Sequence, residues 1–285
     1  MNKLTSNSMG KRIFSTLLLW AITTVAIIYG KSYGWAFLIF ILSAGTISET
    51  CGLLERIGLK PLRKMLQVSN FLIFATAMLM SSIVIGGVIA FVVCTVAITI
   101  SILKDPYGDY APKSAIPSIL CLLAIPFMLQ WLVAMGTCFA GISAYTGVII
   151  AIWIIATAKF SDVGAYVIGA SFGRHKMSPT ISPQKTWEGA VGGLLSSAMM
   201  SAIIFGFASE ILPREITLIE VMVSGVVIGA VAIVSDLLES VLKRRADIKD
   251  SGKFIPGIGG ALDLADSMLL ASPVGFILFW IIFKL

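Results

Sequence analysis

The sequence predicts an all-α polytopic membrane protein with about nine transmembrane helices. Of its 285 residues, 58% are hydrophobic and 13% are charged, and the mean hydropathy is +0.97. This composition is typical of a chain that crosses a bilayer repeatedly, and it excludes an ordinary soluble domain. The apolar residues also gather in segments close to the roughly 20 residues that an α-helix needs to cross the hydrocarbon core.

Nine apolar segments carry this prediction. They cover residues 13–29, 34–48, 69–85, 87–103, 115–136, 143–160, 190–208, 218–238 and 267–283. The run from Phe71 to Leu103 is too long for one span, so we divide it at Gly86-Gly87. The first segment has the basic start and apolar core of a signal peptide, but no small-residue cleavage site follows it, and we expect a retained helix.

The positive charges separate between the two sides of the expected membrane. With nine spans, 18 of the 21 Lys and Arg residues fall on one side, and only Lys31, Arg214 and Lys284 fall on the other. Because cytoplasmic flanks collect Lys and Arg, this predicts a cytoplasmic amino terminus and an outside carboxy terminus. The net charge of +6 therefore follows from topology and predicts no nucleic-acid partner. A basic cytoplasmic face suits anionic lipid headgroups and nucleotides.

We expect one integral-membrane domain over residues 1–285. Residues 1–140 should form mainly packing spans, and residues 144–285 should carry the polar motifs. The stretch from Glu49 to Leu66 is either a basic amphipathic segment on the cytoplasmic surface or an ordinary basic loop. The four cysteines lack metal-site spacing, so we interpret them as small buried apolar residues.

The strongest polar motif lies between Ser235 and Ser267, which holds six of the 15 acidic residues. If the first part is helical, one narrow stripe holds Asp236, Ser240, Lys243 and Asp247, with Glu239 beside it and Arg244 flanking. After a glycine-rich break, Asp263 and Asp266 are three residues apart and would share a helical face. Two carboxylate groups on either side of a turn could converge on a hard cation, with the Lys and Arg residues meeting phosphates. The alternative is a loop of solvated, mutually paired charges.

A second polar block runs from Lys159 to Gly189. Asp162 lies where a span could continue, and an ionisable group there indicates a site. The alternative is that Lys159 pairs with Asp162 and merely ends the span. Pro179 and Pro183 disfavour helix before them, which predicts an extended cytoplasmic loop over Gly164 to Gly189.

The expected loop carries cations and a tryptophan. Arg174, His175 and Lys176 could hold phosphates, although His175 could equally be a loop residue without a catalytic role. Trp187 is either an anchor at the membrane interface or a surface on which a base stacks.

The two blocks resemble the signature of the phosphatidate cytidylyltransferases, or CDP-diacylglycerol synthases. That signature has S-x-x-K-R, then K-D, a Pro-Gly-His-Gly-Gly turn and D-R-x-D. The matching residues are Ser240, Lys243, Arg244, Lys249, Asp250, Pro256, Gly257, Gly259, Gly260, Asp263 and Asp266. Ile258 replaces the usual His and Leu264 replaces the usual Arg. We expect both replacements on the packed side of the turn and the last helix, with Asp263 and Asp266 facing the pocket.

The resemblance implies an enzyme that transfers the cytidylyl group of CTP to phosphatidate, giving CDP-diacylglycerol and pyrophosphate. It implies Mg²⁺, alone or with a second cation, held by Asp236, Asp263 and Asp266. The implied catalytic residues are Asp236, Asp263, Lys243 and Arg244. The implied substrate-binding residues are Lys159, Asp162, Lys185, Ser240, Lys249, Asp250, Gly257, Gly259 and Gly260.

The expected partners are CTP, phosphatidate in the bilayer and other membrane lipids, with a homodimer as one expected assembly. The expected location is a bacterial inner membrane, with the site facing the cytoplasm. Two other readings stay open. Another CTP-using lipid enzyme, such as a CDP-archaeol synthase or a polyprenol kinase, would share the metal and nucleotide chemistry. A secondary transporter could use Asp162 and Asp236 as an ion pathway, but transporter sites lie near the midplane, whereas these charges crowd the cytoplasmic end.

Overall fold

The computed structural model of the chain describes residues 2–79, 83–105, 108–139, 145–208, 212, 216–252, 254 and 259–283. They form two compact units, of which one is Met1–Ala134 with Arg245–Ala265 and the other is Met135–Arg244 with Asp266–Leu285. The expected single membrane domain, divided near residue 140, stays a prediction.

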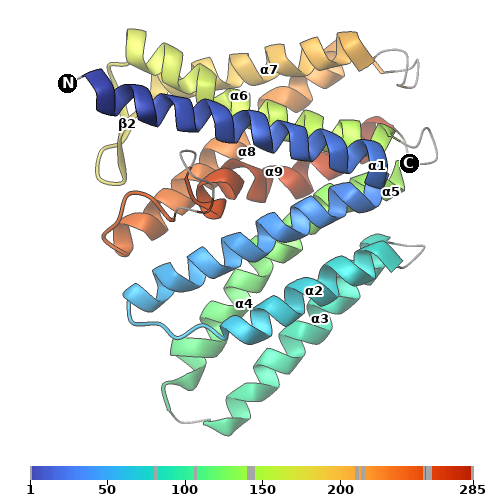
Figure 1. Ribbon diagram of the computed structural model, residues 1–285, viewed down its shortest axis with the longest axis vertical. Coiled ribbons are helices and arrows are strands. Elements are labelled where there is room, and N and C mark those ends of the chain that lie inside the picture. Colours follow the sequence, from blue (N-terminus) through green and yellow to red (C-terminus); the bar gives the residue numbers. More distant parts are fainter. Residues whose placement is uncertain are drawn as a thin grey trace. The chain divides into compact units, whose positions relative to one another are not determined.

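In the first unit, helix α1 (Asn2–Arg56) contains a sharp reversal. Lys31 has non-helical dihedral angles inside it (φ 49°, ψ −132°), and the ribbon turns back on itself there (Figure 1). Gly34 makes this reversal feasible, because a Cβ at that position would overlap the Ala26 carbonyl. The expected spans 13–29 and 34–48 are therefore the two arms of one helical hairpin.

Helices α2 (Arg63–Leu79) and α3 (Ile83–Ile100) follow and pack side by side (Figure 1). The expected break at Gly86-Gly87 is wrong, because both glycines lie inside α3. Gly87 instead allows a close approach, since a Cβ there would overlap the carboxamide of the buried Gln130. Gly87 thus permits close packing inside the helix and does not mark a helix end.

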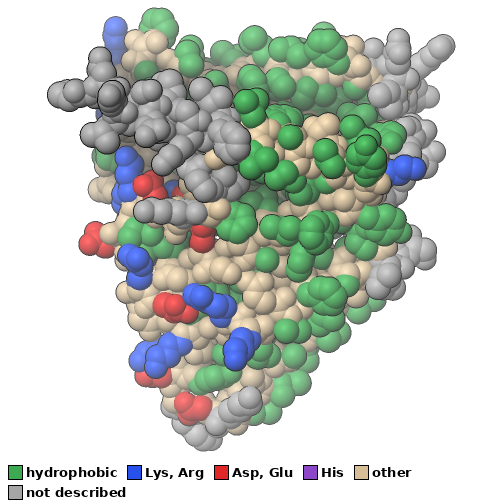
Figure 2. All heavy atoms as spheres, viewed as in Figure 1, with side chains coloured by type: hydrophobic (Ala, Val, Ile, Leu, Met, Phe, Trp, Pro, Cys, Tyr) green, Lys and Arg blue, Asp and Glu red, His purple; other side chains and the backbone are tan. Residues whose placement is uncertain are grey.

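The stretch from Glu49 to Leu66 spans the end of α1, a turn and the start of α2. The stretch is neither one continuous helix nor one continuous loop, and its position on the membrane surface stays a prediction. Arg63 and Glu55 form an exposed ion pair across the turn at 3.2 Å. Figure 2 shows charged side chains of this unit gathered near that connection, whereas hydrophobic side chains cover the lengths of the helices.

The remaining span of the first unit is irregular. A 3-10 turn η1 (Ser101–Lys104) is followed by η2 (Ala111–Ala115), α4 (Ile116–Leu122), η3 (Leu123–Phe127) and α5 (Met128–Cys138). The segments η2 and η3 are π-helical, and prolines occur at 112, 117 and 126. Proline removes a backbone donor and disturbs the regular helical bonding, so local widening of the helix is the expected response.

The second unit is built on α6 (Thr146–Phe172), α7 (Trp187–Ala208), α8 (Leu218–Arg245) and the main part of α9 (Ala261–Ile282). Small residues bring its helices close: a Cβ at Gly164 would overlap Ser196 and the Gly192 carbonyl, and one at Gly229 would overlap Ser197. Trp153 is fully buried, and its indole N–H donates to Ser201 Oγ at 2.8 Å. These helices form a rigid frame for the polar residues at one end.

A β-hairpin joins α6 to α7. Strands β1 (Lys176–Ser178) and β2 (Ser182–Thr186) pair antiparallel. The loop expected over Gly164 to Gly189 is thus extended only after Phe172, because its first residues continue α6.

Seven helices in the described residues are long and apolar enough to cross a membrane. The count takes α1 once and leaves out α2, which has 17 residues. The all-α polytopic membrane fold is confirmed, while the nine crossings and the cytoplasmic amino terminus stay predictions. Cys51, Cys94 and Cys121 are buried thiols as expected, whereas Cys138 is half-buried.

Candidate metal and phosphate site

Three carboxylates of the second unit meet where α8 lies against α9. A hydrogen bond links the two helices, because the Ser235 hydroxyl donates to the Asp266 carbonyl. Asp236 is the next residue on α8, and Glu239 follows one turn later. Carboxylate oxygens of Asp236, Glu239 and Asp266 all lie within 4.8 Å of one another. We call these three residues the carboxylate cluster.

Each acid of the cluster pairs with a lysine from a different element. Lys159 on α6 lies 2.9 Å from Asp266, and Lys185 on β2 lies 2.6 Å from Asp236. Lys243, one turn after Glu239 on α8, lies 2.6 Å from it. The alternative in which Lys159 pairs with Asp162 to end the span is therefore wrong.

These pairs explain how three acids persist beside apolar helices. The Glu239 side chain is only 2% exposed, and the side chains of Asp236 and Asp266 are 20% and 14% exposed. Isolated charges at such depth are strongly unfavourable, and an opposite charge is needed to hold them. Three lysines against three carboxylates leave the cluster close to neutral.

The carboxylate cluster opens into a pocket of about 340 Å³. Asp236 and Asp266 line it together with Asp162, Lys185 and Tyr166. Asp162 thus faces the same space as two of the cluster's acids, which agrees with the expectation that it belongs to a site. The pocket is bounded by α6, β2, the start of α7, α8 and α9.

The donor set fits a hard divalent cation. All three groups are carboxylates, and Mg²⁺ and Ca²⁺ prefer oxygen ligands. Mg²⁺ in particular is commonly held by one or two carboxylates and completes its shell with water and substrate phosphates. The neighbouring lysines are suited to those phosphates as compact cations.

Other predicted residues of α8 lie near its end. Ser240 is half-buried, and Arg244 donates its Nε–H to the Ile181 carbonyl of the hairpin at 3.1 Å. Asp247 does not share the predicted stripe, because α8 ends at Arg245 and Asp247 has a left-handed φ of 55°. The stripe prediction is therefore wrong for Asp247.

The glycine-rich segment belongs to the first unit, where Glu49 of α1 organises it. Glu49 accepts the Ser251 hydroxyl at 3.0 Å and the Leu262 N–H at 2.9 Å. Asp263 accepts the N–H of Gly260 at 3.0 Å and that of Ser251 at 3.3 Å. Asp263 thereby caps the start of α9, and its predicted role as a metal ligand stays a prediction.

The other predicted residues of this segment differ in their exposure and backbone conformation. Lys249 and Asp250 are exposed. Gly259 has a φ of 137°, which favours glycine, and a Cβ at Gly260 would overlap Ser251 and Glu49. Leu264 is half-buried, whereas Pro256, Gly257 and Ile258 lie outside the described residues.

Sequence reasoning missed two acidic residues. Glu239 was placed beside the stripe and not in the site, although its spacing of three from Asp236 and four from Lys243 would have indicated it. Glu188 was not selected, yet its carboxylate lies 2.6 Å from His175 Nδ1. No local signal links Glu188 to His175, because the hairpin between them sets their approach.

The helices and the cluster at their end define an integral membrane protein with a polar site suited to a cation and phosphates. The sequence profile of the cytidylyltransferase family matches residues 10–282. The chain therefore belongs to the cytidylyltransferase family.

Curated relatives carry the name phosphatidate cytidylyltransferase. The Haemophilus influenzae protein is 35% identical over 129 residues, 45% of each chain. The Pseudomonas aeruginosa protein is 38% identical over 134 residues, 47% of this chain and 48% of that one. The Bacillus subtilis protein is 42% identical over 113 residues, 40% of each. Each match thus spans less than half of the relative's length.

Proposed function

We propose that this protein transfers the cytidylyl group of CTP to phosphatidate, giving CDP-diacylglycerol and pyrophosphate. The observation that carries the proposal is the carboxylate cluster, in which each acid pairs with one lysine. The three lysines come from three different elements, α6, β2 and α8. Family membership and the names of the relatives support it. The basic side of the predicted topology favours a site that faces the cytoplasm of a bacterial inner membrane.

The reaction needs charge control more than a base. A phosphate oxygen of phosphatidate forms a bond to the α-phosphorus of CTP, and the bond from that phosphorus to the β-bridging oxygen breaks. Pyrophosphate leaves with that electron pair. The attacking phosphate is already largely ionised near pH 7, because its second pKa is about 6. The protein must therefore bring two anions together and stabilise the leaving group.

The carboxylates and the lysines of the cluster would have different roles in this reaction. Asp236, Glu239 and Asp266 would hold Mg²⁺, which supplies positive charge to the phosphate oxygens. Lys159, Lys185 and Lys243 now neutralise these acids, and they would contact phosphates once the acids bind the cation. Asp162 would orient groups in the same pocket. Asp263, Arg244, Ser240 and the glycine-rich segment keep the roles that the resemblance implies.

The test is synthesis of a labelled lipid by the purified protein. Protein in mixed micelles receives CTP labelled in the cytidine, phosphatidate and Mg²⁺, and the organic phase is counted. We expect labelled lipid, its loss when EDTA is added, and a loss of at least about a hundredfold in Asp266→Asn. Absence of labelled lipid would refute the proposal and leave the polyprenol kinase and transporter readings.

A competition arm separates the related enzymes. Archaeol phosphate is offered beside phosphatidate with the same cytidine-labelled CTP, and a polyprenol is offered with CTP labelled in the γ-phosphate, which is the group that a kinase transfers. Phosphatidate should be the preferred acceptor. Preference for either competitor would assign the protein to another CTP-using lipid enzyme.

A further inference from the structure

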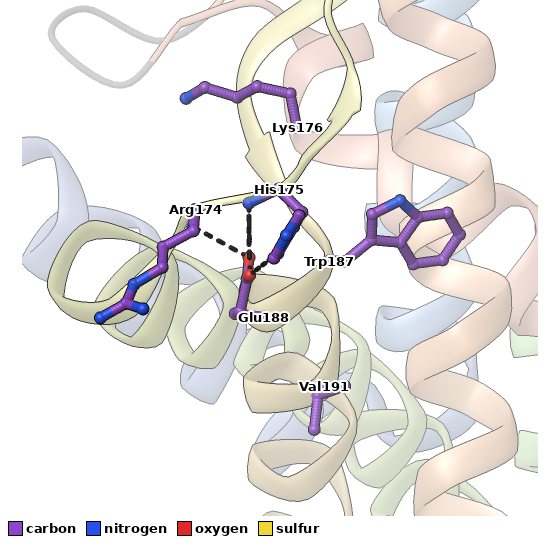
Figure 3. A pocket seen from close by; sticks show the side chains of 6 residues that line it. All are labelled: Arg174, His175, Lys176, Trp187, Glu188 and Val191. Atoms are coloured by element: carbon purple, nitrogen blue, oxygen red, sulfur yellow. Dashed lines mark hydrogen bonds and ion pairs between the residues drawn. The ribbon is translucent and has the colours of Figure 1, made fainter.

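The α6–α7 loop carries a second pocket, which the proposed reaction does not use. It has a volume of about 760 Å³ and is lined by Arg174, His175, Lys176, Trp187, Glu188 and Val191. None of these residues lines the pocket of the carboxylate cluster. In Figure 3, Arg174 and Trp187 extend to opposite sides of the His175–Glu188 pair, and Val191 lies further along α7.

Glu188 fixes the loop that carries the two cations of this pocket. Its carboxylate accepts the backbone N–H of Arg174 at 3.1 Å and that of His175 at 3.2 Å, and it lies 2.6 Å from His175 Nδ1. The backbone N–H of Trp187 also donates to the His175 carbonyl at 3.0 Å. The acid is thus occupied by groups of the loop, and the loop is held against the first turn of α7.

Arg174 and Lys176 leave the pocket with positive charge. Both side chains are exposed, and within the part of the chain that the structure describes neither has an ion-pair partner. The three lysines of the carboxylate cluster, in contrast, are all paired. Two cations on a loop whose backbone Glu188 holds, at the end of a membrane helix, favour an anion that carries phosphate.

The pocket continues into an apolar face of α7. Trp187, Val191 and Leu195 are 58%, 57% and 62% exposed. Residues four apart on a helix differ by about 40° in direction, so these three lie on one strip. The strip belongs to a helix that is apolar enough to span a membrane, and it begins at a tryptophan, which is typical of the headgroup level.

We propose that this pocket binds the phosphate of an anionic phospholipid, whose acyl chains lie along the α7 strip. The cations select the headgroup, and Val191 and Leu195 contact the chains. A soluble phosphate or nucleotide would use the cations but leave the strip without a partner. The site is independent of the proposed transfer reaction, since it shares no residue with the carboxylate cluster.

Binding can be tested without measuring catalysis. The purified full chain is incubated in micelles with phosphatidylglycerol or phosphatidylcholine, and retained lipid is counted by native mass spectrometry. We expect preferential retention of phosphatidylglycerol. The double variant Arg174→Gln/Lys176→Gln should weaken it by about tenfold or more, since each cation near an anionic lipid contributes about a factor of five.

A matched variant separates this pocket from general surface charge. Lys60→Gln/Lys64→Gln removes the same charge from two exposed lysines of the first unit, and it should retain phosphatidylglycerol like the parent chain. Equal loss in both double variants, or loss in neither, would overturn the proposal. Displacement of the lipid by inorganic phosphate or by CTP would also overturn it, because the pocket would then recognise phosphate without the acyl chains.

Discussion

Glu239 is the most enclosed acid of the carboxylate cluster, and we expect its charge to affect both folding and binding. Its side chain is 2% exposed, and that of its partner Lys243 is 15% exposed. Removal of one member of a buried pair leaves the other charge without compensation, at a cost of about 3–5 kcal/mol. The pair is also adjacent to the two acids that line the pocket.

The first prediction is that Glu239→Gln lowers both the melting temperature and labelled-lipid synthesis. The double variant Glu239→Gln/Lys243→Met, which leaves no charge alone, should regain most of the stability while synthesis stays low. Thermal unfolding in detergent and the CTP assay provide the two readouts. The matched control is Glu55→Gln, since the Glu55–Arg63 pair is about half exposed and should contribute less than about 1 kcal/mol. If Glu239→Gln is as mild as this control, Glu239 is not part of the site.

The second prediction concerns Glu49, which reaches the glycine-rich segment from α1. Glu49→Ala removes the acceptor for the Ser251 hydroxyl and the Leu262 N–H. The Ser251 hydroxyl and the Leu262 N–H would be left without this part-buried acceptor, at a cost of about 1–3 kcal/mol, so the segment should open locally. Hydrogen exchange over residues 246–262 should rise by about tenfold. Ser48→Ala is the control, because among the described residues the Ser48 hydroxyl bonds to the Ala44 carbonyl in its own helix and to Gln67. Equal exchange in both variants would contradict the role of Glu49.

At the scale of the elements, glycine spacing determines how α6 meets α7. A Cβ at Gly164 would lie 2.6 Å from the Gly192 carbonyl oxygen, and backbone cannot rotate away as a side chain can. A Cβ at Gly206, also on α7, would meet nothing within 4 Å. The same substitution should therefore have opposite effects at the two positions.

The third prediction is that Gly164→Ala destabilises the protein by about 1–3 kcal/mol, through overpacking. Gly206→Ala should be neutral or stabilise by up to about 1 kcal/mol, because alanine is the better helix former. Thermal unfolding measures both. A stable Gly164→Ala variant would mean that α6 and α7 are further apart than described.

The helices could be predicted from sequence, whereas the contacts that assemble the site could not. Apolar runs indicate α6 to α9 because bilayer thickness sets their length. Asp236 and Asp266 could be selected because charge within such runs is costly and needs a purpose. The i,i+3 spacing offers a Lys159–Asp162 pair as an alternative to a site, but the crossing of α6 and α9 gives Lys159 to Asp266. Gly86-Gly87 resembles a helix break in the sequence, because the local sequence does not show that Gln130 packs against Gly87.

At the scale of the whole molecule, the reversal at Lys31 bears on the number of crossings. Helix α1 has 55 residues, or about 80 Å at 1.5 Å per residue, far more than the roughly 30 Å of a hydrocarbon core. Two arms that each cross would place Lys31 on the side with few positive charges. Arg56 would then lie on the opposite side, and the four spans predicted between Arg56 and the α6–α7 hairpin would place the hairpin on that same, basic side.

The fourth prediction is that cysteines at Tyr33 and Thr180 label from opposite sides of the membrane. Both positions are exposed, Tyr33 two residues after the reversal and Thr180 in the turn of the hairpin. The background would lack Cys51, Cys94, Cys121 and Cys138. In intact cells an impermeant thiol reagent should modify Tyr33→Cys and spare Thr180→Cys, and in opened cells it should modify both. Labelling of Thr180→Cys alone from outside would reverse the predicted orientation. Labelling of both from outside would mean that an even number of crossings separates Tyr33 from Thr180. The nine predicted spans place an odd number between them, so that result would contradict the nine-span prediction.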